Sequence, residues 1–227
     1  YRHEAHSDLD QLGIHNGMDL AHVNPYHTPE FINMKCMISV SNLTLERYFE
    51  PVFQPVNFSL SAGDLVLLTG DNGCGKTTLI RILAGVLAPS QGEIKWGDQG
   101  IVYVGDILAV TDDQTVTENI NFMRQFLGHS EMTTAEIVER VGLRRVCEQT
   151  ARSLSAGQRK RCALARLLLT DAKLWLLDEP YSNLDKQGMA MLDGILGRHL
   201  ESGGACAMAT HGSLRPEGFE YREIGMI

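Results

Sequence analysis

Residues Leu65-Val-Leu-Leu-Thr-Gly-Asp-Asn-Gly-Cys-Gly-Lys-Thr77 set the architecture expected of this 227-residue chain. The first five are apolar enough for a buried strand, and an amphipathic, helix-like run follows Thr77. Between the two lies Gly-x-x-x-x-Gly-Lys-[Ser/Thr] in the strand, loop and helix setting of a phosphate-binding loop. The sequence therefore predicts a nucleoside triphosphate site on an α/β core.

The residues of this loop each have a chemical role in that prediction. Its glycines let the backbone turn N–H groups onto phosphate oxygens, and the following helix adds its positive dipole end. Lys76 supplies a point charge for the β and γ phosphates, and the Thr77 hydroxyl suits Mg²⁺. The residues predicted to bind ATP here are Gly70, Asp71, Asn72, Gly73, Cys74, Gly75, Lys76, Thr77 and Thr78.

The five cysteines indicate neither a disulfide framework nor a zinc site. Their number is odd, no two have Cys-x-x-Cys spacing, and the pattern fits a reducing compartment. Cys74 has two interpretations: a thiol whose alkylation would interfere with nucleotide binding, or a small residue that fits the loop.

Two further stretches carry groups suited to phosphate chemistry. The apolar run Leu174–Leu177 ends in Asp178 and Glu179. A strand-end Asp beside a phosphate loop can hold Mg²⁺, and Glu179 is the expected general base for an attacking water. Ser155, followed by Gly157 and a helical run, predicts a second anion site at a capped helix start, although an ordinary capped helix would look the same.

Composition narrows the class of protein. The chain is 44% hydrophobic and 21% charged, with 20 Lys plus Arg against 28 Asp plus Glu, a net charge of −8. This acidic balance argues against duplex nucleic acid as a partner, because such binders need a concentrated basic face. No apolar run approaches the roughly 18 residues of a membrane helix, and the first residues do not resemble a signal peptide. We therefore expect a soluble, cytosolic chain.

The order of the expected elements predicts an α/β fold with an antiparallel addition. A helical lobe is expected as an insertion at about 108–165, and Thr133 with Glu136 predicts a capping box within it. Strands are expected at Ile38–Leu45, Val56–Leu60, Asp64–Thr69, Ile101–Val104, Leu174–Leu177 and Ala205–Ala209. Helices are expected at about Lys76–Leu87, Thr117–Leu127, Thr134–Val141, Ala156–Leu169 and Lys186–Glu201.

Residues 1–36 differ in composition from the rest of the chain. Five of the eight histidines and two prolines fall there, without apolar periodicity. This segment is expected to be a flexible leader or an added extension ahead of a domain spanning 37–227, with a His-rich metal-binding arm as the alternative.

Five motifs, in order, resemble those of the ABC-type ATPases, the nucleotide-binding subunits of ATP-binding-cassette transporters. They are the phosphate loop, a signature with one Gly-to-Ala change, the strand ending in Asp178 and Glu179, a D-loop, and a switch histidine, His211. The resemblance covers about Met37 to the C-terminus and implies a P-loop NTPase core. The signature residues are Leu154, Ser155, Ala156, Gly157 and Gln158, and the D-loop includes Ser182 and Asp185.

The resemblance also implies a mechanism and partners. Two chains would pair head to tail around two ATP molecules with Mg²⁺, and the signature of one chain would cover the nucleotide of the other. Glu179 would polarise water, and His211 would contact the γ-phosphate. A separate polytopic membrane permease is implied, with this chain bound peripherally at the cytoplasmic face of the inner membrane.

The resemblance also assigns roles to two positions outside these motifs. An aromatic residue upstream of the loop usually stacks on adenine in this family, and Tyr48 is the candidate, with Phe49 in reserve, although either can be ordinary core. Asp106 aligns with the family's usual Gln, so it would act as a Mg²⁺ ligand there or be a solvent-facing loop residue.

Within the family, several stretches look most like the ATPase subunit of cytochrome c maturation, which is associated with haem handling. They are Leu45-Glu-Arg47, Ala165-Arg-Leu-Leu-Leu169 and Leu174-Trp-Leu-Leu-Asp-Glu-Pro180. Two alternatives remain: a cassette serving another small exporter, or an ATP switch that clamps a soluble partner.

Overall fold

The computed structural model describes residues 36–105, 107–127, 130–211 and 214–226. The expectations for 1–36 therefore fall, except for Cys36, outside the described residues. The strands are β1 (Cys36–Thr44), β2 (Glu46–Arg47), β3 (Glu50–Pro51), β4 (Val56–Ser61), β5 (Leu65–Thr69), β6 (Gln91–Trp96), β7 (Ile101–Val104), β8 (Leu174–Asp178), β9 (Ala205–Ala209) and β10 (Arg222–Gly225). The α-helices are α1 (Lys76–Leu83), α2 (Val116–Leu127), α3 (Thr134–Arg140), α4 (Ala156–Leu164) and α5 (Lys186–Glu201). Short 3₁₀ helices are η1 (Arg144–Val146), η2 (Ala151–Ser153) and η3 (Ala165–Leu168).

A five-stranded parallel sheet, in the order β10-β5-β9-β8-β7, lies at the centre of the fold. Its inner strands are continuous apolar runs because helices or a second sheet cover both of their faces. The strand that precedes the phosphate loop, β5, lies beside β9, and β9 separates it from β8. The carboxyl ends of these three strands therefore meet at one edge of the sheet.

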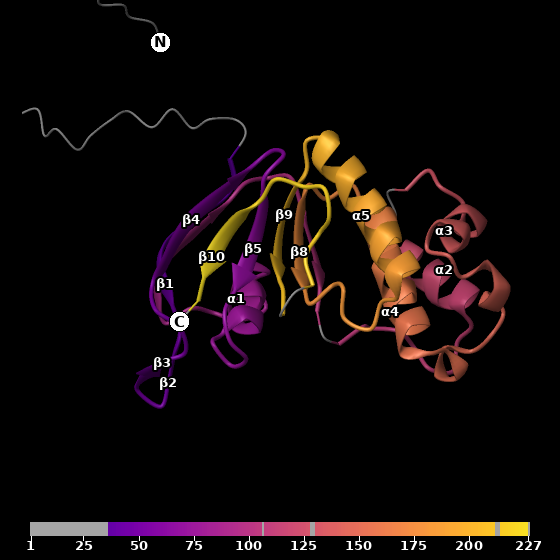
Figure 1. Ribbon diagram of the computed structural model, residues 1–227, viewed down its shortest axis with the longest axis horizontal. Helices are drawn as coiled ribbons and strands as arrows, with labels where there is room; N and C mark the ends of the chain where they lie inside the picture. The colour runs from indigo at the N-terminus through magenta and orange to yellow at the C-terminus, as the bar shows by residue number, and fades with distance from the viewer. Residues whose placement is uncertain (1–35, 106, 128–129, 212–213, 227) are drawn as a thin grey trace, which may run out of the picture. The chain divides into compact units, whose positions relative to one another are not determined.

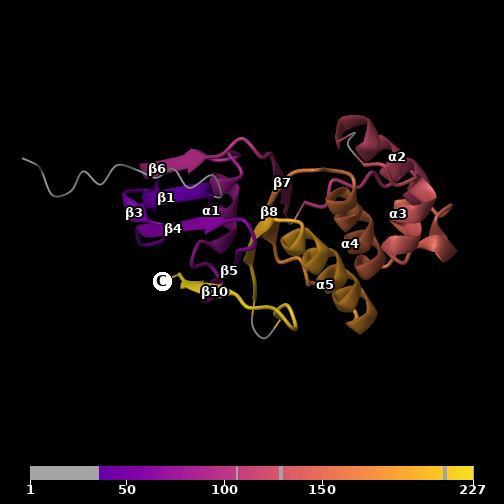
Figure 2. The same cartoon turned by 90° about the horizontal axis from the view of Figure 1, so that it is seen from above.

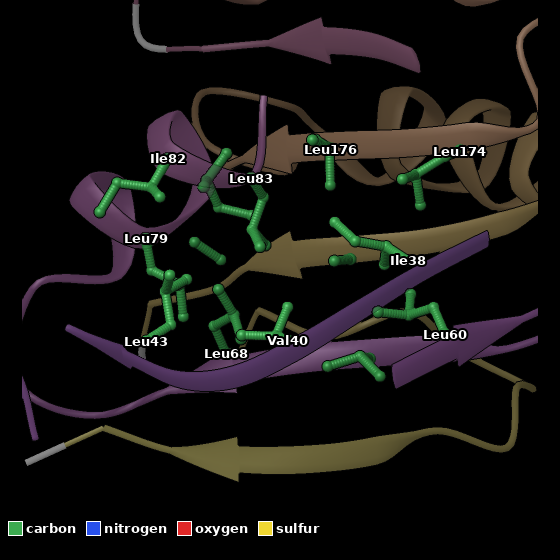
Figure 3. Close-up of a cluster of buried hydrophobic side chains, with 14 of the residues drawn as sticks. Ile38, Val40, Leu43, Leu60, Leu68, Leu79, Ile82, Leu83, Leu174 and Leu176 are labelled. Atoms are coloured by element: carbon green, nitrogen blue, oxygen red, sulfur yellow. The ribbon is translucent and has the colours of Figure 1, made fainter. Parts of the chain in front are cut away.

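The antiparallel addition is confirmed as a sheet in the order β4-β1-β6, with β2 and β3 forming a separate hairpin. Leu68 of β5 and Leu174 and Leu176 of β8 face this side of the parallel sheet. They join Ile38 and Leu60 of the antiparallel sheet and the buried face of α1 in one hydrophobic core (Figure 3). This packing fixes the start of α1, and with it the phosphate loop, against two sheets.

The opposite face of the parallel sheet packs on α5. Strand side chains alternate between faces, so Leu65 and Leu67 of β5 and Trp175 of β8 point to this side. They meet Leu192 and Leu196 of α5. Farther out, α2 and α3 lie beyond α4 and α5, on the side away from the sheets (Figures 1 and 2). Buried side chains of α2, α3 and α4 form a third core of their own.

Several element bounds differ from those expected. The first helix ends at Leu83 rather than Leu87, because Gly85 adopts φ 71° and the N–H of Val86 bonds to the Arg81 carbonyl at 2.9 Å. The helix expected at Ala156–Leu169 changes to 3₁₀ geometry at Ala165, a common tightening at a helix C-terminus. Strands β6 and β10 and the β2–β3 hairpin were not expected from the sequence.

Candidate functional site: a phosphate loop beside strand-end carboxylates

The phosphate loop joins β5 to α1, and its glycines meet specific steric demands. Gly75, the N-cap of α1, has φ 95°, and a Cβ there would lie 2.9 Å from Phe53 Cδ1 and 3.2 Å from the Val52 carbonyl oxygen. Gly70 has φ 143°, and a Cβ there would lie 2.4 Å from the Met226 carbonyl oxygen. Any side chain at either position would displace the loop.

Lys76 is the first residue of α1, and its buried side chain turns back against the loop. Its Nζ donates to the carbonyl oxygens of Gly70 at 2.7 Å and Asp71 at 2.9 Å, and it lies 3.7 Å from Cys74 Sγ. The chain thus closes on the ammonium group, and the loop's backbone amides are arranged around a fixed positive charge. Such an arrangement suits an anion with several oxygens.

The strand-end carboxylate Asp178 reaches the first turn of α1. Thr77 Oγ1 donates to Asp178 Oδ1 at 3.1 Å, although 101 residues separate them. Asp178 is 2% exposed. Two oxygen ligands suited to a hard cation therefore lie side by side at the loop.

Glu179 follows at once and adopts φ 46°, which is rare for a residue with a side chain. The strained backbone is held from both sides. Its N–H donates to the Ala209 carbonyl at 3.0 Å, and its carbonyl accepts from Ser182 N at 3.1 Å and Ser182 Oγ at 2.9 Å. These bonds turn Glu179 out of the sheet, where it is exposed.

Two cavities flank the loop. The phosphate-loop cavity, about 240 Å³, combines loop residues with Glu179 and with hairpin residues: Arg47, Val52, Asn72, Gly73, Gly75, Lys76, Thr77, Thr78 and Glu179. The His211 cavity, about 430 Å³, lies between the start of the loop and the chain after β9: Thr69, Gly70, Asp71, Asn72, Thr210, His211 and Arg215. Asn72 belongs to both.

The signature residues form a separate site at the start of α4. Ser155 caps the helix: its Oγ accepts from Gln158 N at 3.2 Å, and Gln158 Oε1 accepts from Ser155 N at 2.9 Å. Gly157 leaves no room for a side chain, since a Cβ would lie 2.7 Å from the Asn183 carbonyl oxygen. Leu154 is buried beneath, and Ala156 is exposed.

The D-loop is tied to the signature helix. Asp185 caps α5 by accepting from Gly188 N at 2.8 Å, and it forms an ion pair with Arg161 of α4. The Gly188 amide, and then Arg161, hold the pKa of the Asp185 carboxyl below its usual value. A cavity of about 510 Å³ unites both motifs: Gly142, Ser155, Ala156, Gly157, Gln158, Arg161, Asn183, Asp185 and Gln187.

The structure thus brings the predicted residues together as two groups rather than one. The loop, Asp178 and Glu179 meet at one end of the sheet, whereas the signature and the D-loop line a different cavity. Tyr48 and Phe49 lie at the tip of the hairpin, 96% and 101% exposed, and line neither cavity beside the loop. Asp106 lies outside the described residues, so its role stays a prediction.

Some residues of these cavities were missed in the sequence. Arg161 belongs to no recognised motif, and nothing in its local sequence indicates an ion pair with Asp185, 24 residues further along the chain. Arg215 carries no signal, because its place in the His211 cavity depends on how the chain returns from β9 to β10.

Comparison with known proteins agrees with this geometry. The family model described as ABC transporter matches residues 53–182. The protein named "Cytochrome c biogenesis ATP-binding export protein CcmA" from Xanthomonas campestris pv. campestris (strain 8004) is 39% identical over 201 residues, which cover 84% of this chain and 92% of the relative. Its namesake from Shewanella frigidimarina is 37% identical over 186 residues, 77% and 86% of the two chains.

Solved structures show the same fold. A putative ABC transporter ATP-binding protein from Pyrococcus furiosus aligns with a TM-score of 0.70 at 22% identity, covering 83% of this chain and 96% of that one. A putative metal-chelate type ABC transporter in an inward-facing conformation aligns with a TM-score of 0.63 at 28% identity, covering 78% of this chain and 74% of that one.

Within the described residues, no helix has both the length and the apolar character needed to cross a membrane. With a family model over more than half of its length and relatives that it covers almost end to end, this chain belongs to the ABC transporter family, as an ATP-binding subunit of the CcmA type.

Proposed function

We propose that this chain hydrolyses ATP to energise a separate membrane protein of an export system in cytochrome c biogenesis. The observation that carries the ATPase part is the meeting of Lys76, Thr77, Asp178 and Glu179 at the carboxyl edge of the sheet. The names of the relatives from Xanthomonas and Shewanella support the biological setting. A membrane protein as partner would place the chain peripherally at the cytoplasmic face of the membrane.

The side chains beside the loop divide the chemistry among themselves. The loop amides and Lys76 bind the β and γ phosphates, and Glu179 accepts a proton from the water that attacks the terminal phosphorus. His211 orients the γ-phosphate from the other side of the loop. Exposure of Glu179 leaves room for that water.

A divalent cation fits the pair Thr77 and Asp178. Their oxygens are hydroxyl and carboxylate, the ligand types that Mg²⁺ prefers, and lie 3.1 Å apart. Mg²⁺ held there would neutralise charge on the β and γ phosphates. Few protein ligands suffice, because Mg²⁺ retains several waters and takes phosphate oxygens.

We further propose that the working form is a head-to-tail homodimer. In one chain the signature cavity and the phosphate-loop cavity are distinct sets of residues. A second copy would bring Ser155 and Gly157 over the nucleotide of the first, so that ATP itself joins the two chains and its hydrolysis releases them.

The test uses Glu179→Gln, which removes the base and keeps the shape of the side chain. We expect this variant to accumulate as an ATP-bound dimer on gel filtration, and Lys76→Ala to lose ATP binding. A Glu179→Gln protein that binds ATP yet stays monomeric would overturn the dimer, and undiminished ATP affinity in Lys76→Ala would overturn the site.

The partner is tested separately, by purifying Glu179→Gln protein with ATP from native membranes in mild detergent. Recovery of a membrane protein of cytochrome c maturation is the expected result. Recovery of a different permease would keep the ATPase and reject the biological setting. Recovery of soluble proteins alone, from ATP-bound protein, would favour an ATP switch instead.

A further inference from the structure

A cationic side chain outside the recognised motifs lines the His211 cavity. Arg215 lies in the chain between β9 and β10 and shares this cavity with the first residues of the phosphate loop. Its side chain is 37% exposed. The cavity also contains Asp71, whose carboxylate would disfavour a second anion unless a cation offset it.

The interactions that Arg215 makes in this structure are weak enough to be broken. Its guanidinium forms an ion pair with Glu223 of the edge strand β10 and donates to Tyr221 Oη at 3.4 Å. The Glu223 side chain is 42% exposed. A half-exposed pair of this kind contributes little to stability, so a stronger anion can replace the carboxylate. Phosphate is such an anion, because a guanidinium can bind two of its oxygens at once.

The residue that the two cavities share indicates where the terminal phosphate of a bound nucleotide would lie. Arg47 of the hairpin and Val52, which follows it, line the phosphate-loop cavity but not the His211 cavity, whereas Asn72 lines both. A nucleotide whose base lies toward the hairpin would extend its phosphates along the loop toward Asn72. The terminal phosphate would then lie nearest the His211 cavity and Arg215.

We propose that Arg215 breaks its ion pair with Glu223 and binds the terminal phosphate of the nucleotide. The site would thereby prefer a triphosphate over a diphosphate. The inference rests on the nucleotide site proposed above. It assigns Arg215 to nucleotide specificity and Glu223 to holding it in the absence of that phosphate. ADP lacks the group that Arg215 would bind, so the effect is confined to ATP.

The experiment compares ATP and ADP affinities of Arg215→Gln by equilibrium titration in the Glu179→Gln background, which prevents turnover. We expect the affinity for ATP to fall about tenfold, as for loss of a partly exposed charge-assisted hydrogen bond, and that for ADP to change less than twofold. Glu223→Gln, which frees Arg215, should tighten ATP binding and leave ADP unchanged. Arg222→Gln is the matched control: Arg222 pairs with Asp64 at 3.1 Å nearby, and it lines neither cavity beside the loop.

The outcomes separate the possibilities. Equal losses for ATP and ADP, or no loss for either, would overturn the role of Arg215, as would the same selective loss in Arg222→Gln. The titrations use protein concentrations below those at which the ATP-bound dimer forms, so that gel filtration shows a monomer with either nucleotide. A loss seen only when chains pair would assign Arg215 to the partner chain instead and also overturn the proposal. Lys76→Ala in parallel tests the nucleotide site itself: if it still binds ATP, the proposed site fails rather than Arg215 alone.

Discussion

Backbone strain falls on Glu179, a residue assigned to the chemistry. A side chain at φ 46° costs of order 1 kcal/mol and persists only where the surroundings impose it. Hydrogen bonds to Ala209 and Ser182 do so here. Because the bond to Ala209 comes from the end of β9, the position of Glu179 depends on the strand that leads to His211. The two predicted catalytic side chains are thus linked through the backbone.

A second residue, His199, is unusual because it is buried in its neutral form. Its ring stacks on Trp175 with centroids 3.6 Å apart and an interplanar angle of 11°. Its Nε2 lies 3.2 Å from the Ala205 carbonyl oxygen, and a Cβ at Gly204 would lie 2.2 Å from its Cε1. Burial lowers the pKa of His199 from 6.5 to about 4.

This depressed pKa predicts a loss of stability in mild acid. Between pH 6.5 and pH 4 the unfolded chain binds a proton at His199 that the folded chain does not, so the free energy of unfolding falls as pH falls. We expect His199 to account for a loss of about 2 kcal/mol between pH 7.5 and pH 5. Urea denaturation at the two pH values measures it. His199→Gln should be less stable at both but lose this pH dependence, and an unchanged dependence would contradict the assignment.

At the scale of elements, two helices start with the same device. Thr133 caps α3 and Ser155 caps α4, each in a capping box, with Glu136 and Gln158 as the third residue of the helix. The capping box expected at Thr133 is thereby confirmed. The same kind of capping interaction stabilises the start of both helices. A comparison of variants at Thr133 and Ser155 therefore isolates what Ser155 does beyond capping.

We expect Ser155→Ala and Thr133→Ala each to lower the free energy of unfolding by about 1 kcal/mol, because each loses one cap. Only Ser155→Ala should also lower ATPase turnover and ATP-dependent pairing, since its hydroxyl would contact the nucleotide of the other chain. Thermal melts and steady-state ATPase assays provide the two measurements. Equal ATPase activities in the two variants would indicate that Ser155 only caps its helix and does not contact the nucleotide.

Across the whole molecule, Arg166 of η3 joins the parallel sheet to the helices beyond it. Its guanidinium donates to the carbonyl oxygens of Ala163 at 3.1 Å, Tyr103 at 3.4 Å and Leu108 at 2.5 Å. Tyr103 belongs to β7, whereas Leu108 begins the chain that leads to α2. One side chain thus connects the end of the sheet, the helical layer and the helix that begins at the signature.

Arg166→Met should lower the free energy of unfolding by about 2 kcal/mol, because three partly buried carbonyls lose hydrogen bonds from a charged donor. Arg166→Lys, which keeps the charge but offers fewer bonds, should lose less. Urea denaturation followed by both tryptophan fluorescence and circular dichroism measures the change and whether unfolding stays a single transition. Equal losses in both variants would indicate that side-chain packing, not hydrogen bonding, is what Arg166 contributes.

Elements with strong apolar runs were predicted well. The observed bounds of β7, β9 and α5 equal those expected: Ile101–Val104, Ala205–Ala209 and Lys186–Glu201. The strands that were missed lie at sheet edges. In β6, Gln91–Trp96, five of six residues are exposed, and β10 has four residues with three exposed. Edge strands like these are stabilised by backbone pairing with the neighbouring strand. Their own residues therefore show little of the apolar pattern by which a strand is predicted.

The sequence by itself determined the phosphate loop, the strand-end carboxylates, the capped signature helix and the family. Each is defined by the spacing of residues that are close together in the sequence, so it can be recognised without knowing how the chain folds. Tertiary structure alone decided what lies next to what. It brought Thr77 to Asp178 across 101 residues, tied Arg161 to Asp185, and placed Arg215 in the cavity of His211. These contacts join residues far apart in the sequence, and they depend on the order of the strands in the sheet and on the paths of the loops between them. No local sequence pattern specifies either.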